Sequence, residues 1–174
     1  FQNYALFENM TVLGNVEYAL KKRKELKKDA REIAEKMIDI VGLSEHKNRK
    51  PYKLSGGQQQ RVAIARTLAL NPDIILFDEP MSALDVDTRM TLRTELKELQ
   101  KKFGTTMIYI THDQEEAFAM SDRIMVMNEG IIHQIDTPKN LIDNPADEYV
   151  ENFVIKNIKM KIDSLIQFVD TNRE

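Results

Sequence analysis

The spacing of apolar residues predicts helices in the first part of the chain. Residues 11–24 are expected to form a helix capped by Thr11, and residues 29–41 a second helix that ends at Gly42. The apolar residues of the second helix recur on one face, as packing against a core requires. They are Ala30, Ile33, Ala34, Met37, Ile38 and Val41.

A polar connector follows these two helices, from Ser44 to Lys53. A third helix is expected to start near Ser55 and to end before Asn71-Pro72, because proline disfavours helical backbone at the residue before it. The first seventy residues or so are therefore predicted to be mostly helical.

Strands and helices alternate in the rest of the chain. Ile74–Phe77 and Thr106–Ile110 are short apolar runs of the kind that form buried parallel strands. The other expected elements are a helix over 85–103 with Leu92, Leu96, Leu99 and Phe103 inward, a short helix over 114–120, strands over 123–127 and 131–135 joined by a hairpin at Asn128-Glu129-Gly130, a helix from Thr137-Pro138, a helix from Asn144-Pro145 through Phe153, and a terminal helix within 156–174 with Ile158, Ile162, Leu165 and Ile166 inward. This alternation predicts an α/β fold with a mostly parallel sheet.

Composition and charge narrow the class of protein. The 174 residues are 42% hydrophobic and 30% charged, with a net charge of −3, which is ordinary for a globular protein and argues against a nucleic-acid partner. There is no cysteine, so disulfides, thiolate catalysis and Cys-ligated zinc are excluded. No apolar run approaches the roughly 20 residues that a membrane-spanning helix needs.

The clearest candidate for chemistry is a pair of glycines at the predicted start of the third helix. Ser55, Gly56, Gly57 and Gln58 offer a hydroxyl, a side-chain amide and backbone N–H groups that no Cβ shields. A helix N-terminus adds unpaired donors and the positive end of its dipole. The pattern fits a phosphate-binding site, and a simple helix-capping loop is the structural alternative.

Acidic residues follow the first predicted strand. Asp78 and Glu79 come directly after an apolar run, where ligands bind in open α/β sheets. An aspartate in this place helps to hold Mg²⁺ in P-loop enzymes, and a neighbouring glutamate can orient or deprotonate a water molecule. His112 follows the second predicted strand and is expected at the same sheet edge, within reach of a γ-phosphate.

Taken together, these motifs resemble the ABC ATPase family over nearly all of residues 1–155. The segments Leu54-Ser55-Gly56-Gly57-Gln58-Gln59-Gln60-Arg61, Ile75-Leu76-Phe77-Asp78-Glu79-Pro80, Ser82-Ala83-Leu84-Asp85, Thr111-His112-Asp113 and Phe1-Gln2 resemble the ABC signature, Walker B with the catalytic glutamate, the D-loop, the H-loop and the Q-loop. The segments Asn9-Met10-Thr11-Val12, Glu115-Glu116-Ala117, Ser121-Asp122-Arg123, Gly130-Ile131-Ile132 and Thr137-Pro138 are similar to the bacterial importer branch, which includes maltose, polyamine, ferric-iron, phosphonate and glycine-betaine systems.

The resemblance implies a P-loop NTPase core with an inserted helical subdomain. Residues 1–72 would hold the helical subdomain, 73–155 the RecA-like α/β part, and 156–174 a tail that is expected to be helical. Two subunits would sandwich two ATP molecules head to tail. The implied roles are γ-phosphate contacts in trans for Ser55, Gly56, Gly57 and Gln58; Mg²⁺ binding for Asp78 and Gln2; catalysis by Glu79, His112 and Gln2; an action across the dimer interface for Asp85; and permease contacts for Tyr4, Leu6 and Phe7, with core packing as the alternative for Leu6.

One expected motif is absent from these residues. Walker A requires Gly-x-x-x-x-Gly-Lys followed by Ser or Thr. The glycines, at positions 14, 42, 56, 57, 104 and 130, do not provide this spacing. The chain therefore reads as N-terminally truncated, without the first strands and the Walker A loop. The 174 residues alone are expected to bind ATP weakly and to hydrolyse none, and micromolar Mg-ATP affinity in isothermal titration would contradict this.

The main hypothesis is thus an ATP-hydrolysing subunit that powers solute uptake, at the cytoplasmic face of the membrane and attached to a permease. Two alternatives stay open: a non-transport ABC ATPase that acts on DNA or ribosomes, and a piece without ATPase activity that keeps only the permease-docking and signature surfaces. Co-purification with a permease or with nucleic acid would separate the first two.

Overall fold

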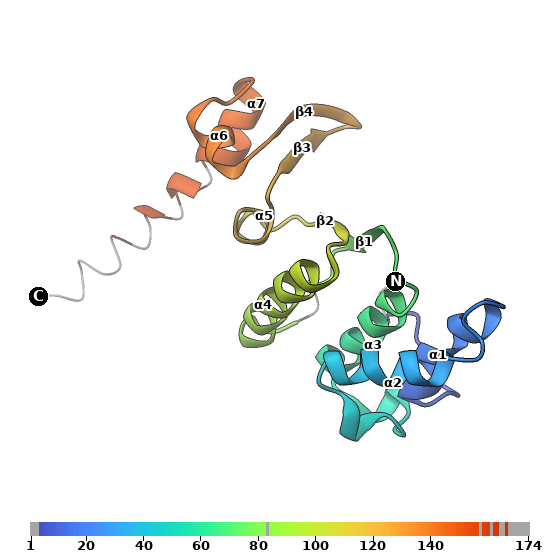
Figure 1. Ribbon diagram of the computed structural model, residues 1–174. Helices are drawn as coiled ribbons and strands as arrows, with labels where there is room; N and C mark the ends of the chain where they lie inside the picture. Colours follow the sequence, from blue (N-terminus) through green and yellow to red (C-terminus); the bar gives the residue numbers. More distant parts are fainter. Residues whose placement is uncertain (1–3, 83, 157, 161, 164–165, 167–174) are drawn as a thin grey trace, which may run out of the picture. The chain divides into compact units, whose positions relative to one another are not determined.

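The chain forms two compact units, Phe1–Ile110 and Thr111–Glu174 (Figure 1). The computed structural model describes residues 4–82, 84–156, 158–160, 162–163 and 166. The first unit contains α1 (Val12–Lys22), α2 (Ala30–Ile40), the 3₁₀ turns η1 (Ser44–His46) and η2 (Pro51–Lys53), α3 (Gly56–Leu68), β1 (Ile74–Asp78), α4 (Val86–Phe103) and β2 (Thr106–Ile110). The second contains α5 (Gln114–Met120), β3 (Ile124–Asn128), β4 (Ile131–Asp136), α6 (Pro138–Asp143), α7 (Glu148–Val150) and the π-helical segment η3 (Glu151–Lys156).

Side-chain caps fix where the helices of the first unit begin. The hydroxyl of Thr11 accepts from the N–H of Gly14 at 3.1 Å, so α1 starts where the sequence predicts. Ser55 and Asp85 cap α3 and α4 in the same way. At the other end of α4, Gly104 adopts φ +62°, a left-handed conformation that glycine reaches without a Cβ penalty.

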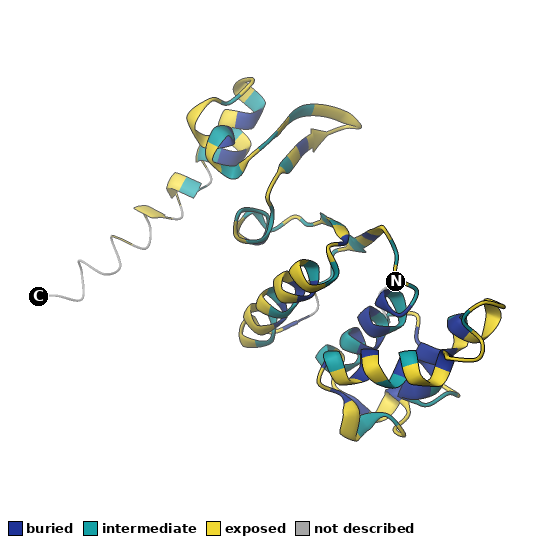
Figure 2. Cartoon of the chain, in the orientation of Figure 1, coloured by how far each residue is buried: buried dark blue, intermediate teal, exposed yellow. Residues whose placement is uncertain are grey.

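Helices α1, α2 and α3 pack against one another around an aliphatic core (Figure 2). Buried members of this core include Val12, Val16, Leu20, Ala30, Ala34, Ile38, Val62, Ala65 and Leu68. The connector closes the N-terminus of α1, since the N–H groups of Val12 and Leu13 donate to the carbonyls of Arg49 and Lys47. The mostly helical character predicted for this part is confirmed.

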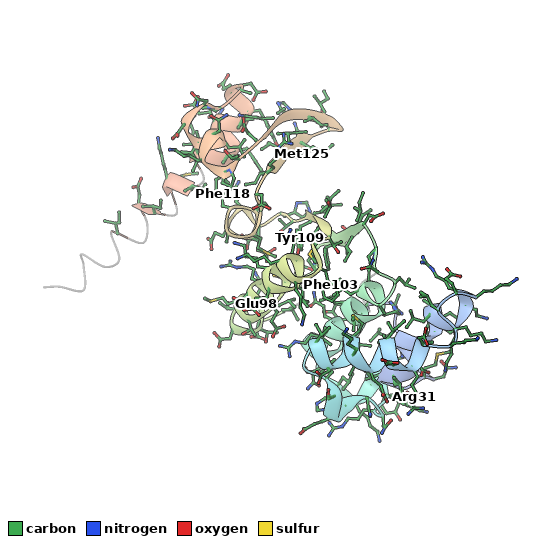
Figure 3. The ribbon with its side chains drawn as sticks, in the orientation of Figure 1. Arg31, Glu98, Phe103, Tyr109, Phe118 and Met125 are labelled. Atoms are coloured by element: carbon green, nitrogen blue, oxygen red, sulfur yellow. The ribbon has the colours of Figure 1, made fainter. Side chains whose placement is uncertain are left out.

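Strands β1 and β2 pair in parallel, with Asp78 opposite Ile110. On one face Phe77 stacks on its register partner Tyr109, with ring centroids 4.8 Å apart. Tyr109 is labelled in Figure 3. The other face is open: Leu76 is 72% exposed and Ile108 48%. The prediction of parallel strands is confirmed, and the prediction that both are buried is wrong, because within the described residues packing covers only one face.

Strands β3 and β4 of the second unit form the predicted hairpin, which turns at Glu129 and Gly130, both with positive φ. Val126 of the hairpin packs with Leu141, Val150 and Val154. The prediction that a helix begins at Asn144-Pro145 is wrong, because residues 144–146 are not helical. Their backbone is hydrogen-bonded to the side chain of Gln134 on β4, and the helical segment starts only after the cap at Asp147.

The burial of apolar residues in the tail differs from the prediction. Ile158 packs against the core of the second unit, whereas Ile162 is 49% exposed and Ile166 53% exposed. These two side chains therefore do not face the core, and Leu165 lies outside the described residues. Among the helices that the structure describes, none is both long enough and apolar enough to cross a bilayer.

Candidate functional site

Residues 55–58, the glycine segment, form the first turn of α3 and its cap. The hydroxyl oxygen of Ser55 accepts from the N–H of Gln58 at 3.3 Å, and the side-chain oxygen of Gln58 accepts from the N–H of Ser55 at 3.0 Å. This reciprocal capping box holds Ser55 in an extended conformation just before the helix. The segment is thus a capping loop, as the structural alternative anticipated. Whether it can also bind an anion depends on its remaining hydrogen-bond donors.

The capping box uses the N–H of Gln58 and leaves those of Gly56 and Gly57 without an intrahelical acceptor. The hydroxyl of Ser55 accepts one bond through its oxygen and keeps its own hydrogen to donate. Ser55 and Gly56 are exposed, and Gly57 is half-buried. Three donors and the positive end of the helix dipole are therefore available to an anion at this surface.

Two contacts around the glycine segment were not foreseen from the sequence. The Nε2 atoms of Gln58 and His46 are 3.0 Å apart. The amide nitrogen of Gln58 is a donor, so this His46 nitrogen is placed to accept from it. A Cβ added at Gly57 would lie 3.1 Å from the Cγ2 atom of Thr88, so glycine here also serves packing against α4. The sequence offers no local signal for either contact.

Asp78, Glu79 and Pro80, the carboxylate segment, lie at the carboxyl end of β1. Asp78 is exposed there, and Glu79 is half-buried with φ +44°, a left-handed conformation that is unfavourable for a side chain with a Cβ. The N–H of Glu79 donates to the carbonyl of Ile110 at 2.9 Å, which fixes the segment to the end of β2. The carbonyl of Glu79 accepts from the hydroxyl of Ser82 at 3.0 Å.

Helix α3 is joined to the carboxylate segment and to α4. The side-chain amide of Gln60 donates to the carbonyl of Pro80 at 2.5 Å, and Arg61 pairs with Glu95 at 2.6 Å. The structure therefore brings the glycine segment, the carboxylate segment and the start of α4 into one unit. A candidate anion site and two candidate catalytic carboxylates therefore share one scaffold.

Asp85 is the N-cap of α4. Its two carboxylate oxygens accept from the N–H of Thr88 at 2.9 Å and from the Thr88 hydroxyl at 2.7 Å. The backbone bond from Thr88, with the hydroxyl bond after it, lowers the pKa of this carboxyl group. Asp85 thus has a structural task, and the role across a dimer interface that the resemblance implies stays a prediction. Ala83, in the same motif, lies outside the described residues.

Substitution of Asp85 separates these two tasks. Asp85→Asn keeps a good N-cap and removes the charge, whereas Asp85→Ala removes both. We expect the Asn variant to melt like the wild type at pH 7 and the Ala variant to melt at a lower temperature. The pKa of Asp85 is lower in the native state than in the unfolded chain. The charged cap therefore stabilises the native state fully at pH values above the ordinary aspartate pKa of about 3.9, and this stabilisation is lost as the pH falls through the native pKa. Thermal melts at pH 3 and 7 should therefore show less acid sensitivity for Asp85→Asn. Equal melting of Asp85→Ala and wild type would contradict the capping role.

His112 lies in the second unit, two residues after the end of β2. Its neighbours are fixed locally: the hydroxyl of Thr111 donates to Glu116 at 2.8 Å, and Asp113 caps α5 by accepting from the N–H of Glu115 at 2.8 Å. Gln2 lies outside the described residues. The catalytic roles of His112 and Gln2 stay predictions.

The expected permease contacts differ in exposure. Leu6 is buried, which agrees with core packing, and Phe7 is 36% exposed with its ring 4.7 Å from that of Tyr18 on α1. Tyr4 is half-buried, and its carbonyl accepts from the Arg66 guanidinium at 3.0 Å. Tyr18 was not singled out from the sequence, although an exposed aromatic residue on a predicted helix is a usable signal.

The carboxylate segment offers oxygen ligands of the kind that Mg²⁺ prefers. The described residues contain no group of three or more histidine, cysteine, aspartate or glutamate side chains that could hold one. Mg²⁺ differs from most metals in keeping several waters and taking one or two carboxylates together with phosphate oxygens. The exposed Asp78 carboxylate at the end of β1 fits that requirement.

Known proteins share the resemblance to the ABC ATPase family. Residues 1–82 match the family described as ABC transporter. A spermidine/putrescine import ATP-binding protein of Bacillus cereus is 52% identical over 157 residues, 90% of this chain and 48% of the relative. A Fe(3+) ions import ATP-binding protein of Fusobacterium nucleatum is 47% identical over 161 residues, 92% of this chain and 43% of the relative. The chain thus spans less than half the length of these curated relatives.

The fold is similar to that of a solved ABC ATPase structure. The solved structure is the dimeric, post-hydrolysis state of an ATP-binding cassette bound to ADP and Pi, with a TM-score of 0.65 and 37% identity over 79% of this chain and 61% of that one. The fold is therefore that of an ABC-type ATPase. The chain is homologous, more particularly, to the ATP-binding subunits of bacterial ABC importers.

Proposed function

We propose that this chain is part of an ATP-hydrolysing subunit that powers solute uptake through an ABC permease. The observation that carries the proposal is the joining, in one unit, of a capped helix start with free donors and a carboxylate segment at a parallel sheet edge. Its relatives are named for polyamines and for ferric iron at similar identity, so similarity does not select a solute.

In this proposal two subunits form a head-to-tail dimer. The Ser55 hydroxyl and the N–H groups of Gly56 and Gly57 donate to the γ-phosphate of an ATP molecule held by the other subunit, and the Gln58 amide lies beside them. The support is their exposure at the start of α3 and their freedom from intrahelical acceptors. The helical part, residues 1–72, faces the permease, and residues 73–155 form the catalytic core, at the inner face of the membrane.

Hydrolysis in this proposal depends on the carboxylate segment. Asp78 would bind Mg²⁺ through water, and Gln2 would contact the ion or that water. When bound, the ion would neutralise charge on the phosphate oxygens. Glu79 orients the attacking water and accepts its proton, while His112 donates a hydrogen bond to the γ-phosphate. Asp85 acts at the dimer interface from its cap position on α4.

The test uses the full-length protein, co-expressed with a candidate ABC permease from the same organism. We expect the purified complex to hydrolyse ATP, and Phe7→Ala to weaken permease association by about 10-fold, since an exposed aromatic anchor commonly contributes that much. Tyr52→Ala is the matched control, because Tyr52 is more exposed, at 63%, and lies in η2 and not in the Phe7–Tyr18 ring pair. Equal association of the two variants would contradict the docking surface. Co-purification with ribosomes or DNA in place of a permease would contradict transport.

A further inference from the structure

The side chain of Gln60 forms a buried link between two functional segments. Gln60 lies one turn after Gly57 on α3 and is 3% exposed. Its Nε2 donates to the carbonyl of Pro80, 20 residues further along the chain. The link therefore runs from the helix that starts with the glycine segment directly to the carboxylate segment.

The carboxylate segment is held in a strained conformation by several bonds. Glu79 has φ +44°, which costs free energy for any residue with a Cβ and persists only when surrounding contacts enforce it. Its N–H donates to Ile110, its carbonyl accepts from the N–H and hydroxyl of Ser82, and the next carbonyl accepts from Gln60. Of these bonds, only that from Gln60 comes from α3.

Packing alone does not account for an amide at position 60. The Oε1 atom of Gln60 is buried and has no hydrogen-bond partner within the described residues, which is unfavourable for a carbonyl oxygen. A leucine would fill a similar volume without that unpaired atom. The amide at position 60 is therefore explained by its Nε2 group, which donates to the carbonyl of Pro80.

We infer that Gln60 is a positioning residue that couples the anion-binding start of α3 to the orientation of Glu79 in the same subunit. The inference rests on the proposed function and deepens it. In a head-to-tail dimer the glycine segment contacts the partner's ATP, whereas Glu79 acts on the subunit's own ATP. A shift of α3 on contact with phosphate would pull on Pro80, so occupancy of one site would adjust catalysis at the other.

The test compares Gln60→Leu with Gln59→Leu in the full-length protein assembled with the proposed permease. Gln59 is the matched control, since its amide also donates to backbone carbonyls, of Pro51 and Leu54, but away from the carboxylate segment. We expect Gln60→Leu to lower kcat about 10-fold with KM for ATP within about twofold of wild type, because misplacement of a catalytic group by a fraction of an ångström affects the chemical step. Gln59→Leu should keep wild-type kcat.

A second readout follows the backbone directly. Hydrogen exchange at the amides of Glu79 and Ser82 should be faster in Gln60→Leu and unchanged in Gln59→Leu, with Tm measured on both. Wild-type kcat and exchange in Gln60→Leu would overturn the inference, as would an equal kcat loss in both variants. A wild-type complex that does not hydrolyse ATP would instead overturn the proposed function, which keeps the two failures distinct.

Discussion

Replacing Glu79 by glutamine is expected to reduce ATP turnover by about 10²- to 10⁴-fold, the usual contribution of a general base, while leaving ATP binding intact. The amide matches the carboxylate in size and accepts hydrogen bonds through one oxygen, but it cannot take the proton of the attacking water. The bonds that hold the segment involve backbone atoms of Glu79 and survive the change. Phosphate release and equilibrium nucleotide binding, measured on the permease complex, check the two halves of this prediction.

Glu129→Gln provides a matched control for this substitution. Glu129 is also a glutamate with positive φ, +49°, but it lies in the β3–β4 turn. The control therefore reproduces the loss of charge at a left-handed backbone position without touching the carboxylate segment. Turnover within a few-fold of wild type in Glu79→Gln, or an equal loss in Glu129→Gln, would rule out Glu79 as the base.

The second large effect is expected for Gly57→Ala, in contrast to Gly56→Ala. Both glycines lie in the first turn of α3 with φ outside the left-handed region, so the backbone accepts alanine at either. At Gly56 the nearest atom to a new Cβ is Leu84 Cδ2 at 4.0 Å, and Gly56→Ala should stabilise the fold by about 0.4–1 kcal/mol. At Gly57 the new Cβ meets Thr88 Cγ2 at 3.1 Å.

Thr88 cannot readily yield to that contact, because its hydroxyl is bonded to Asp85 at 2.7 Å. Overpacking of this kind costs about 1–3 kcal/mol, which outweighs the gain in helix propensity of at most about 1 kcal/mol. Gly57→Ala should therefore destabilise the fold by about 1 kcal/mol and lower turnover. Denaturant unfolding of the four proteins in the Gly57→Ala/Thr88→Ser cycle is the measurement, as Thr88→Ser removes Cγ2 and keeps the hydroxyl.

The cycle also separates packing from anion binding. Recovery of stability in the double variant without recovery of turnover would mean that glycine is needed for the approach of phosphate as well. Equal stability of Gly57→Ala and Gly56→Ala would contradict the steric argument.

Helix starts and the order of elements could be predicted from the sequence, because the interactions that decide them are local. Thr11, Ser55 and Asp85 each cap a helix through a bond that spans three residues. Parallel pairing of β1 with β2 also followed, since a helix between two apolar runs implies a crossover connection. The motif order was sufficient to indicate the family, as the curated relatives confirm.

Burial and the links between motifs could not be predicted in this way. An apolar run such as Ile74–Phe77 predicts a strand, but what covers each face depends on residues far along the chain, and Leu76 is exposed. The start of the helical segment near 145 was misplaced because Gln134, on another element, binds its backbone.

By itself, then, the sequence determined the class of protein and the glycine and carboxylate segments, because these rest on short-range spacing. Only the tertiary structure decided that Gly57 packs on Thr88 and that Gln60 bonds to Pro80, 20 residues away. Such contacts depend on how α3 lies against α4 and the end of β1, and this arrangement cannot be predicted from a local sequence pattern. The physical connection between the two segments is therefore a property of the fold.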